Sequence, residues 1–178
     1  MDYSSFNWSD SAEIQALYQK VFTDSEGQSE GVLIGQLVQD MMDNTDEADL
    51  FGFVAREQNQ IVGCTFYTRL WFDKPLEAFI LSPVAVLPSF QGQGIGKTLI
   101  SYGLGQLAEH NVDLVFTYGD PNYYSKLGFQ SITEDLIKAP LAMSQPEGWL
   151  CQALNGGEIK PIPGPSRCVE ALNDPVYW

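Results

Sequence analysis

A run with three glycines, Q-G-Q-G-I-G-K-T at positions 91–98, sets the strongest local limit on how this chain folds. A β-rich apolar segment ending in V-A-V-L-P comes directly before it, and residues 95–110 carry apolar side chains at helical spacing. The run therefore forms a tight turn from a strand into a helix. Backbone N–H groups at a helix start have no partner within the helix and attract anions. This pattern predicts a binding loop for a phosphate-bearing ligand.

Two common phosphate-binding motifs do not fit the run. A Walker A loop that ended at Gly96, Lys97 and Thr98 would need a glycine where the chain has Gln91. A dinucleotide-binding G-x-G-x-x-G fingerprint that began at Gly92 would need a glycine at position 97, which is a lysine. The spacing that does fit is Q-x-x-G-x-G, which begins at Gln91 and ends at Gly96.

Hydrophobic periodicity before the loop predicts helices followed by a β-meander. A short strand near residues 3–7 precedes two amphipathic helical stripes, and the second stripe begins at Val32. Three β-rich runs follow within residues 50–86, and a tight turn near residues 58–60 joins the first two. Pro83 lies inside the third run and cannot donate a ladder hydrogen bond, so we expect a bulge or an exposed edge there.

The second half of the chain completes an α/β pattern and then changes character. The run D-L-V-F-T-Y is typical of a buried strand, and N-Y-Y-S-K-L before Gly128 is typical of a short helix with a glycine end. Six of the ten prolines lie from Pro140 onward. We therefore expect one domain over residues 1–139, with residues 140–178 as a Pro-rich carboxyl-terminal extension packed on it.

Composition excludes several classes of function. A formal charge of −14 with only nine lysines and arginines argues against general nucleic-acid binding. Three widely spaced cysteines and a single histidine, His110, predict no disulfide framework, no metal site and no Ser-His-Asp triad. The chain shows no signal peptide and no apolar run near the roughly 18 residues that span a bilayer, so we expect a cytoplasmic protein without a membrane partner.

The Q-x-x-G-x-G loop, with its preceding strand and following helix, resembles the acetyl-CoA pyrophosphate loop of the GCN5-related N-acetyltransferases, the GNAT family. The run Y-Y-S-K-L-G-F, from Tyr123 to Phe129, is similar to the Y-x-x-x-G-F signature that follows in this family. The longer form G-D-P-N-Y-Y-S-K-L-G-F looks like the YhbS-type branch. The chain departs from the wider family at Thr117, where the family pattern has an asparagine. Asn122 lies nearer the tyrosine and could take its place.

The resemblance implies a mixed, largely antiparallel, twisted sheet flanked by helices, with acetyl-CoA as cosubstrate. The pantetheine arm would pair with backbone groups of Val84, Ala85 and Val86, and one of their N–H groups could stabilise an oxyanion. The pyrophosphate would lie on a loop made of Gln91, Gly92, Gln93, Gly94, Ile95, Gly96 and Lys97. Asn122 is a further candidate for cofactor contact.

The same resemblance implies an acyltransferase in which a primary amine of a small molecule or peptide attacks acetyl-CoA directly. Tyr124 corresponds to the usual family acid, and Glu77, with Asp73 beside it, is a candidate base. A non-catalytic acetyl-CoA-binding sensor is the alternative, and a nucleotide-phosphate enzyme built on Gly96-Lys97-Thr98 is a weaker one. A strand with an exposed edge near the tail could support a homodimer. The acidity of the chain favours a cationic acceptor, and an anionic group would need a local positive site.

Overall fold

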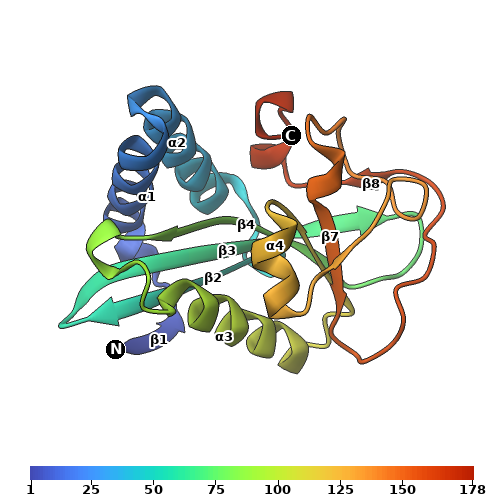
Figure 1. Cartoon of the computed structure of the whole chain (residues 1–178), viewed down its shortest axis with the longest axis horizontal. Helices are drawn as coiled ribbons and strands as arrows, with labels where there is room; N and C mark the ends of the chain where they lie inside the picture. Colours follow the sequence, from blue (N-terminus) through green and yellow to red (C-terminus); the bar gives the residue numbers. More distant parts are fainter. The chain divides into compact units, whose positions relative to one another are not determined.

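The structure is a computed structural model that describes residues 1–178, and it contains helices and strands in an α/β order (Figure 1). The α-helices are α1 (Ser11–Glu26), α2 (Gln28–Asn44), α3 (Ile95–Glu109) and α4 (Pro121–Tyr124). The strands are β1 (Asp2–Ser5), β2 (Leu50–Glu57), β3 (Gln60–Phe72), β4 (Ala78–Val86), β5 (Leu114–Tyr118), β6 (Gln130–Ser131), β7 (Trp149–Ala153) and β8 (Ser166–Arg167). Their hydrogen-bonded order is β1-β2-β3-β4-β5-β7-β6, and β8 pairs with β3.

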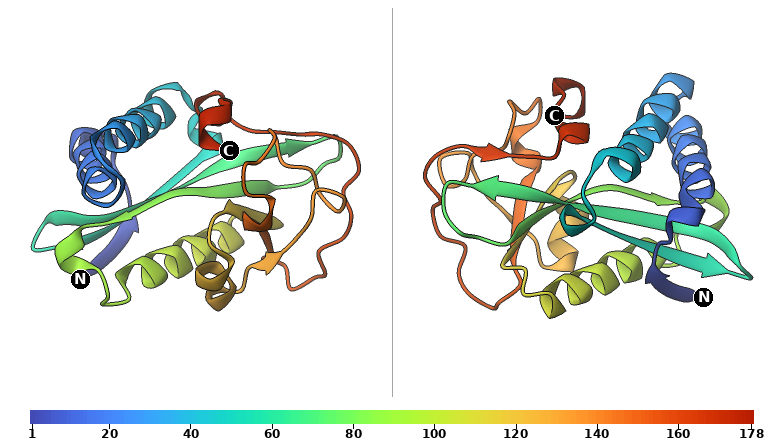
Figure 2. Two further views of the ribbon diagram at one scale, coloured as in Figure 1. Left: turned by 45° about the horizontal axis from the view of Figure 1, so that its top comes forward. Right: turned by 180° about the vertical axis from the view of Figure 1, so that it is seen from behind.

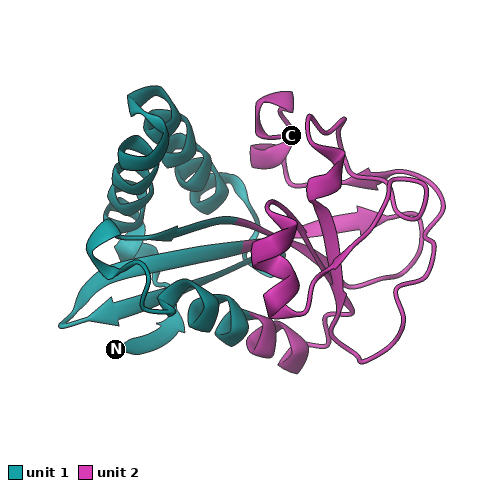
Figure 3. Cartoon of the chain, in the orientation of Figure 1, with its two compact units in different colours: residues 1–66, 83–103 teal, residues 67–82, 104–178 magenta.

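The sheet is mixed and mostly antiparallel, as predicted. The β4–β5 pair is parallel, whereas β1–β2, β5–β7, β6–β7 and β3–β8 are antiparallel. The chain divides into two compact units (Figure 3). Unit 1 contains residues 1–66 and 83–103, and unit 2 contains residues 67–82 and 104–178. No helix in the chain is both long and apolar enough to cross a bilayer.

In unit 1, helices α1 and α2 lie side by side in every view (Figure 2). Both bury most of the apolar stripes expected from their three- and four-residue spacing, but Phe22 and Leu33 are only partly buried and Val32 is 51% exposed. Gly31 permits the close approach of the two helices: a Cβ added there would lie 2.6 Å from the backbone oxygen of Gln19 and would overlap the Thr23 hydroxyl. The two helices are thus held at a spacing that only a glycine allows at this position.

The turn between β2 and β3 confirms the predicted meander. Gln58 and Asn59 both have positive φ angles, of 48° and 67°, which suits a two-residue hairpin turn. The Glu13 carboxylate on α1 accepts a hydrogen bond from the Ile61 N–H at 2.8 Å, just after this turn. Helix α1 is therefore fixed to the start of β3.

Strand β4 corrects one expectation. The prediction of an exposed edge at Pro83 is wrong, because β4 has neighbouring strands on both sides in the hydrogen-bonded order and Pro83 is buried. The parallel ladder of β4 with β5 runs from Ala78 to Leu81 and stops there. The ladder with β5 therefore requires no bond from the proline, which has no N–H to donate.

The tail residues belong to unit 2. Strand β7 pairs along the whole of β5, and Trp149 at its start is fully buried, with its indole N–H donating to the backbone oxygen of Ile137 at 2.9 Å. The last residue, Trp178, is also buried and its ring stacks on Tyr118 at a centroid distance of 5.9 Å. The proposed domain boundary after residue 139 stays a prediction.

Candidate active site

The glycine-rich loop lies in unit 1, between the end of β4 and the start of α3. Gly92 and Gly94 adopt the left-handed conformation, with φ angles of 75° and 80°, and a Cβ at either would meet nothing within 4 Å. Only glycine takes this conformation without strain. The loop backbone therefore has a conformation that suits glycine, and no side chain covers it at Gly92 or Gly94.

The start of α3 supplies the N–H groups that the sequence predicts for an anion. The backbone bond from the Thr98 N–H to the Gly94 oxygen, at 3.0 Å, closes the first turn, so the N–H groups of Ile95, Gly96 and Lys97 have no acceptor within the helix. The Lys97 side chain is exposed and makes no ion pair. This helix end therefore offers three N–H groups, the positive end of a helix dipole and one free ammonium group.

Side-chain hydrogen bonds of Gln91 and Thr98 fix the two ends of the loop. The Gln91 side chain donates to the backbone oxygen of Val86 at 2.9 Å, which ties the loop to the last residue of β4. The Thr98 hydroxyl donates to the Gly94 oxygen at 3.1 Å. The Thr98 side chain is therefore tied to the first turn of α3.

The predicted pantetheine-binding residues form the last part of β4, also in unit 1. The Tyr18 hydroxyl donates to the backbone oxygens of Cys64 and Pro83, both at 2.9 Å, and so fixes β4 against β3 just before these residues. Ala85 is buried, whereas Val84 and Val86 are partly exposed. None of the three takes part in the ladder with β5, which ends at Leu81.

Tyr124 lies at the end of α4 in unit 2. The Asp120 side chain caps this helix by accepting from the Asn122 N–H at 2.9 Å, and Pro121 occupies the first helical position. The Tyr124 ring packs directly against Gly119, and only a glycine leaves room for it there, because a Cβ would lie 2.6 Å from the ring. The Asn122 side chain is exposed and makes no hydrogen bond within the protein, so it is available to a ligand.

Thr117 lies beside the Tyr124 phenol. The Thr117 hydroxyl donates to the backbone oxygen of Leu81 at 3.0 Å. Burial raises the pKa of Tyr124 to about 12, although Thr117 lowers it somewhat. Burial also raises the pKa of Tyr67, and the neighbouring Tyr124 adds to that rise. The phenol is therefore protonated, and able to donate, over the whole neutral range.

Sequence reasoning missed two of these supporting residues. Thr117 stood out only as a departure from the family asparagine, and its hydrogen bond to the Leu81 backbone oxygen, beside Tyr124, gives it a structural role of its own. The Gly119 contact had no sequence signal, because it depends on how the Tyr124 ring folds back on the end of β5.

Glu77, the candidate base, lies just before β4 in unit 2. Its carboxylate pairs with the Arg69 guanidinium at 2.6 Å and its side chain is 53% exposed. One of the two Glu77 carboxylate oxygens is therefore engaged in the ion pair with Arg69. The Glu77 N–H donates to the Asp113 carboxylate at 3.0 Å, and the Glu77 backbone oxygen accepts from the Asp113 N–H at 2.8 Å.

The cysteine thiols and the imidazole of His110 do not lie in surroundings that would activate them for catalysis. Burial raises the pKa of the Cys64 thiol to about 12 and that of the Cys151 thiol to about 12, so neither is a nucleophilic thiolate. His110 is exposed at the end of α3 and one of its ring nitrogens lies 2.8 Å from the Gln106 backbone oxygen. No group of three or more histidine, cysteine, aspartate or glutamate residues could hold a metal ion.

Comparison with known proteins agrees with this arrangement. Residues 48–131 match the acetyltransferase (GNAT) domain. The chain is 29% identical over 141 residues to the uncharacterized N-acetyltransferase YjhQ of Escherichia coli (strain K12), covering 75% of this chain and 77% of that protein. It is also 29% identical over 127 residues to the uncharacterized N-acetyltransferase YhbS of the same strain, covering 68% of each.

Two solved structures share the fold over nearly the whole chain. The crystal structure of YhbS from Escherichia coli in complex with CoA has a TM-score of 0.79 at 24% identity, covering 97% of this chain and 92% of that one. A GNAT family acetyltransferase from Brucella melitensis in complex with acetyl-CoA has a TM-score of 0.75 at 24% identity, covering 97% of both. Residues 48–131 are thus similar to the acetyltransferase (GNAT) domain. Over most of its length the chain is similar to GNAT N-acetyltransferases and shares their fold.

Proposed function

We propose that the protein transfers an acetyl group from acetyl-CoA directly to a primary amine of a small molecule or peptide. The observation that carries this proposal is the loop before α3, where left-handed Gly92 and Gly94 open the backbone beside three unpaired N–H groups. Such a helix start suits a pyrophosphate. The solved relatives that share the fold were crystallised with CoA and with acetyl-CoA, which supports the same cosubstrate for this chain.

The proposed cofactor contacts use backbone more than side chains. The pyrophosphate would accept from the N–H groups at the start of α3, with Lys97 adding a cation. The pantetheine arm would pair with the backbone of Val84–Val86, which lies beyond the end of the β4–β5 ladder at Leu81. An N–H group in this stretch would donate to the thioester oxygen as it becomes an oxyanion. Asn122 would contribute a side-chain amide to the cofactor.

In the proposed reaction a neutral amine attacks the thioester carbonyl carbon. A C–N bond forms, the carbonyl oxygen becomes an oxyanion, and the tetrahedral intermediate collapses with cleavage of the C–S bond. The amine loses one proton and the CoA sulfur leaves as a thiolate that finally takes up one proton. No covalent acetyl-enzyme and no metal is needed for this sequence.

Tyr124 would act as a hydrogen-bond donor to the departing sulfur. A phenol with a pKa of about 12 remains protonated, but full proton transfer to a thiolate whose parent thiol has a pKa near 8.5 would be uphill by about 5 kcal/mol. Donation of a hydrogen bond stabilises the developing negative charge without that transfer. The thiolate would then take its final proton from water or from the acceptor.

An acetyl-CoA-dependent assay tests the proposed function. Release of free CoA thiol, followed against a panel of primary amines and short peptides, is expected to rise above the amine-free rate for at least one member. Calorimetric titration of acetyl-CoA measures cofactor binding separately. Binding of acetyl-CoA with no transfer to any member would favour the sensor alternative, and no binding at all would contradict the proposal.

The role of Glu77 as a base stays a prediction that one variant can decide. If Glu77 removed the amine proton, Glu77→Gln would lower kcat on the order of a hundredfold. Because Arg69 already pairs with this carboxylate at 2.6 Å, we expect a fall of less than about threefold, with water as the proton acceptor. The measurement is kcat for Glu77→Gln and for the wild type across pH, and a hundredfold fall would assign the base to Glu77.

A further inference from the structure

The Tyr18 hydroxyl is a buried side-chain donor that joins two strands of unit 1. Tyr18 lies on α1 and is fully buried. Its hydroxyl lies 2.9 Å from the backbone oxygen of Cys64 on β3 and 2.9 Å from that of Pro83 on β4. A phenol has one proton to donate and both carbonyl oxygens only accept, so the two hydrogen bonds share that proton. The hydroxyl therefore holds both oxygens toward one point between the strands.

The packing around Tyr18 fixes the position of this hydroxyl. The Tyr18 ring stacks on Phe22 of the same helix at a centroid distance of 6.4 Å and on Phe66 of β3 at 6.1 Å. The bond from the Ile61 N–H to the Glu13 carboxylate, at 2.8 Å, ties α1 to the start of β3. Because the helix and the ring are both held, the hydroxyl is a fixed point to which the backbone of β4 is attached.

The hydrogen bond to Pro83 sets the direction of the next backbone N–H. The Pro83 carbonyl and the Val84 N–H belong to one peptide plane, and a trans peptide directs its oxygen and its hydrogen to opposite sides. The Val84 N–H therefore points away from the Tyr18 hydroxyl. A hydrogen bond to the oxygen of an amide also polarises the amide, which makes its N–H a stronger donor.

The next residues along the chain give the Val84 N–H the same direction. Just after β4, the Leu87 N–H donates to the Val62 oxygen on β3 at 2.8 Å. Backbone groups alternate along a strand, so those of Val84 and Val86 face away from β3. The Val86 oxygen accordingly accepts from the Gln91 side chain at 2.9 Å. The Val84 N–H lies on that same edge of β4, beyond the end of the ladder with β5.

We propose that Tyr18 is a positioning residue for acetyl transfer, whose hydroxyl fixes the Pro83–Val84 peptide so that the Val84 N–H is held toward the thioester oxygen. The inference rests on the proposed function, in which an N–H group of this stretch stabilises the oxyanion. An N–H group whose direction is set before the reaction stabilises developing charge without the cost of turning a dipole. Helix α1 would thereby contribute to the reaction without touching the cofactor.

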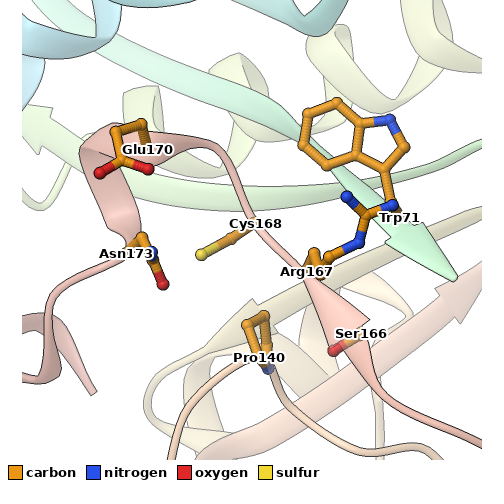
Figure 4. A pocket seen from close by; sticks show the side chains of 7 residues that line it. All are labelled: Trp71, Pro140, Ser166, Arg167, Cys168, Glu170 and Asn173. Carbon is orange, nitrogen blue, oxygen red and sulfur yellow. The ribbon is translucent and has the colours of Figure 1, made fainter.

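A cavity in unit 2 contains none of these residues. Its volume is about 290 Å³, and Trp71, Arg167 and Glu170 are among the residues that line it (Figure 4). The pairing of β8 with β3 sets Arg167 opposite Trp71, and the guanidinium carbon lies 5.9 Å from the centroid of the indole ring. No residue proposed to bind acetyl-CoA lines this cavity. Its side chains therefore support no role in the proposed reaction.

Two matched probes test the positioning role of Tyr18. S-ethyl-CoA has a methylene group where acetyl-CoA has its thioester carbonyl and is otherwise identical. Calorimetry on the wild type should show acetyl-CoA bound on the order of fivefold more tightly, because S-ethyl-CoA cannot accept the hydrogen bond. Tyr18→Phe removes the hydroxyl and keeps the ring. We expect its preference for acetyl-CoA to fall below about twofold, while its affinity for S-ethyl-CoA stays within about twofold of the wild type.

Ile14→Val is the control for lost stability. Ile14 is fully buried one turn before Tyr18 on α1, and both variants should lower the melting temperature by roughly 2–4 °C. Ile14→Val should keep the full preference for acetyl-CoA. Infrared spectra of bound acetyl-CoA give a second measurement, because a hydrogen bond lowers the stretching frequency of the thioester carbonyl. That frequency should be lower on the wild type and on Ile14→Val than on Tyr18→Phe.

Any of three results would overturn the inference. Equal binding of the two probes by the wild type would mean that no N–H group donates to the thioester oxygen. A preference that Tyr18→Phe keeps, or that Ile14→Val loses, would mean that the hydroxyl does not position the donor. A Tyr18→Phe protein that unfolds or loses affinity for S-ethyl-CoA would mean that the hydroxyl supports the whole fold and not one peptide. Failure of the wild type to bind either probe contradicts the proposed function itself, and it is recognised without any variant.

Discussion

Gly94→Val is expected to weaken acetyl-CoA binding roughly a hundredfold, which corresponds to about 3 kcal/mol. Gly94 has a φ of 80°, a conformation that costs a β-branched residue on the order of 1–2 kcal/mol, so the loop backbone will shift. Its Cβ would also stand in the open space beside the helix start. Loss of two charge-assisted hydrogen bonds to phosphate accounts for a change of this size. Titration calorimetry with acetyl-CoA measures it.

Gly156→Val is the matched control for this loop variant. Gly156 has a φ of 73° and a Cβ there would also meet nothing within 4 Å, but it lies in the turn after β7. Both variants should lose similar stability to backbone strain in thermal unfolding, whereas only Gly94→Val should lose acetyl-CoA affinity. Equal affinity in the two variants would place the pyrophosphate elsewhere.

Much of the fold was predictable from local patterns. The start of α3, the β2–β3 turn and the short helix α4 depend on glycines and on side-chain spacing within a few residues, and the structure confirms them. The error at Val32 arose because its spacing fits a helical stripe whose edge faces solvent. The expected edge at Pro83 failed because strand order depends on contacts between distant segments.

The features that the sequence did not predict depend on long-range pairing. Strand β8 has only two residues, so it shows no periodicity, yet it sets Arg167 opposite Trp71 and forms one side of the cavity. The hydrogen bond from the Thr117 hydroxyl to the Leu81 backbone oxygen likewise depends on the register that places Thr117 opposite Leu81. A sequence indicates which residues are present at such positions, but the register decides which of them meet.

Tyr124→Phe is expected to lower kcat on the order of a hundredfold, with little change in acetyl-CoA affinity. The Phe variant removes only the phenol hydroxyl and keeps the ring, which packs edge-to-face on Phe129 at a centroid distance of 5.7 Å. The loss is therefore that of a hydrogen bond to the departing sulfur and not of packing. Steady-state kinetics at saturating acceptor, with calorimetry for the cofactor, separates the two effects.

Tyr123→Phe is the control, since Tyr123 precedes Tyr124 and its ring lies 5.0 Å away in an edge-to-face contact. Its kcat should stay within about threefold of wild type. The pH dependence gives a second check. A neutral phenol donates below its pKa and loses this ability as pH rises through that value, which is about 12 for Tyr124. The ratio of wild-type to Tyr124→Phe rates should therefore stay constant between about pH 6 and pH 10. A ratio that fell within this range would mean that the donor titrates lower and is not the buried phenol, and an unchanged kcat in Tyr124→Phe would remove Tyr124 from the reaction.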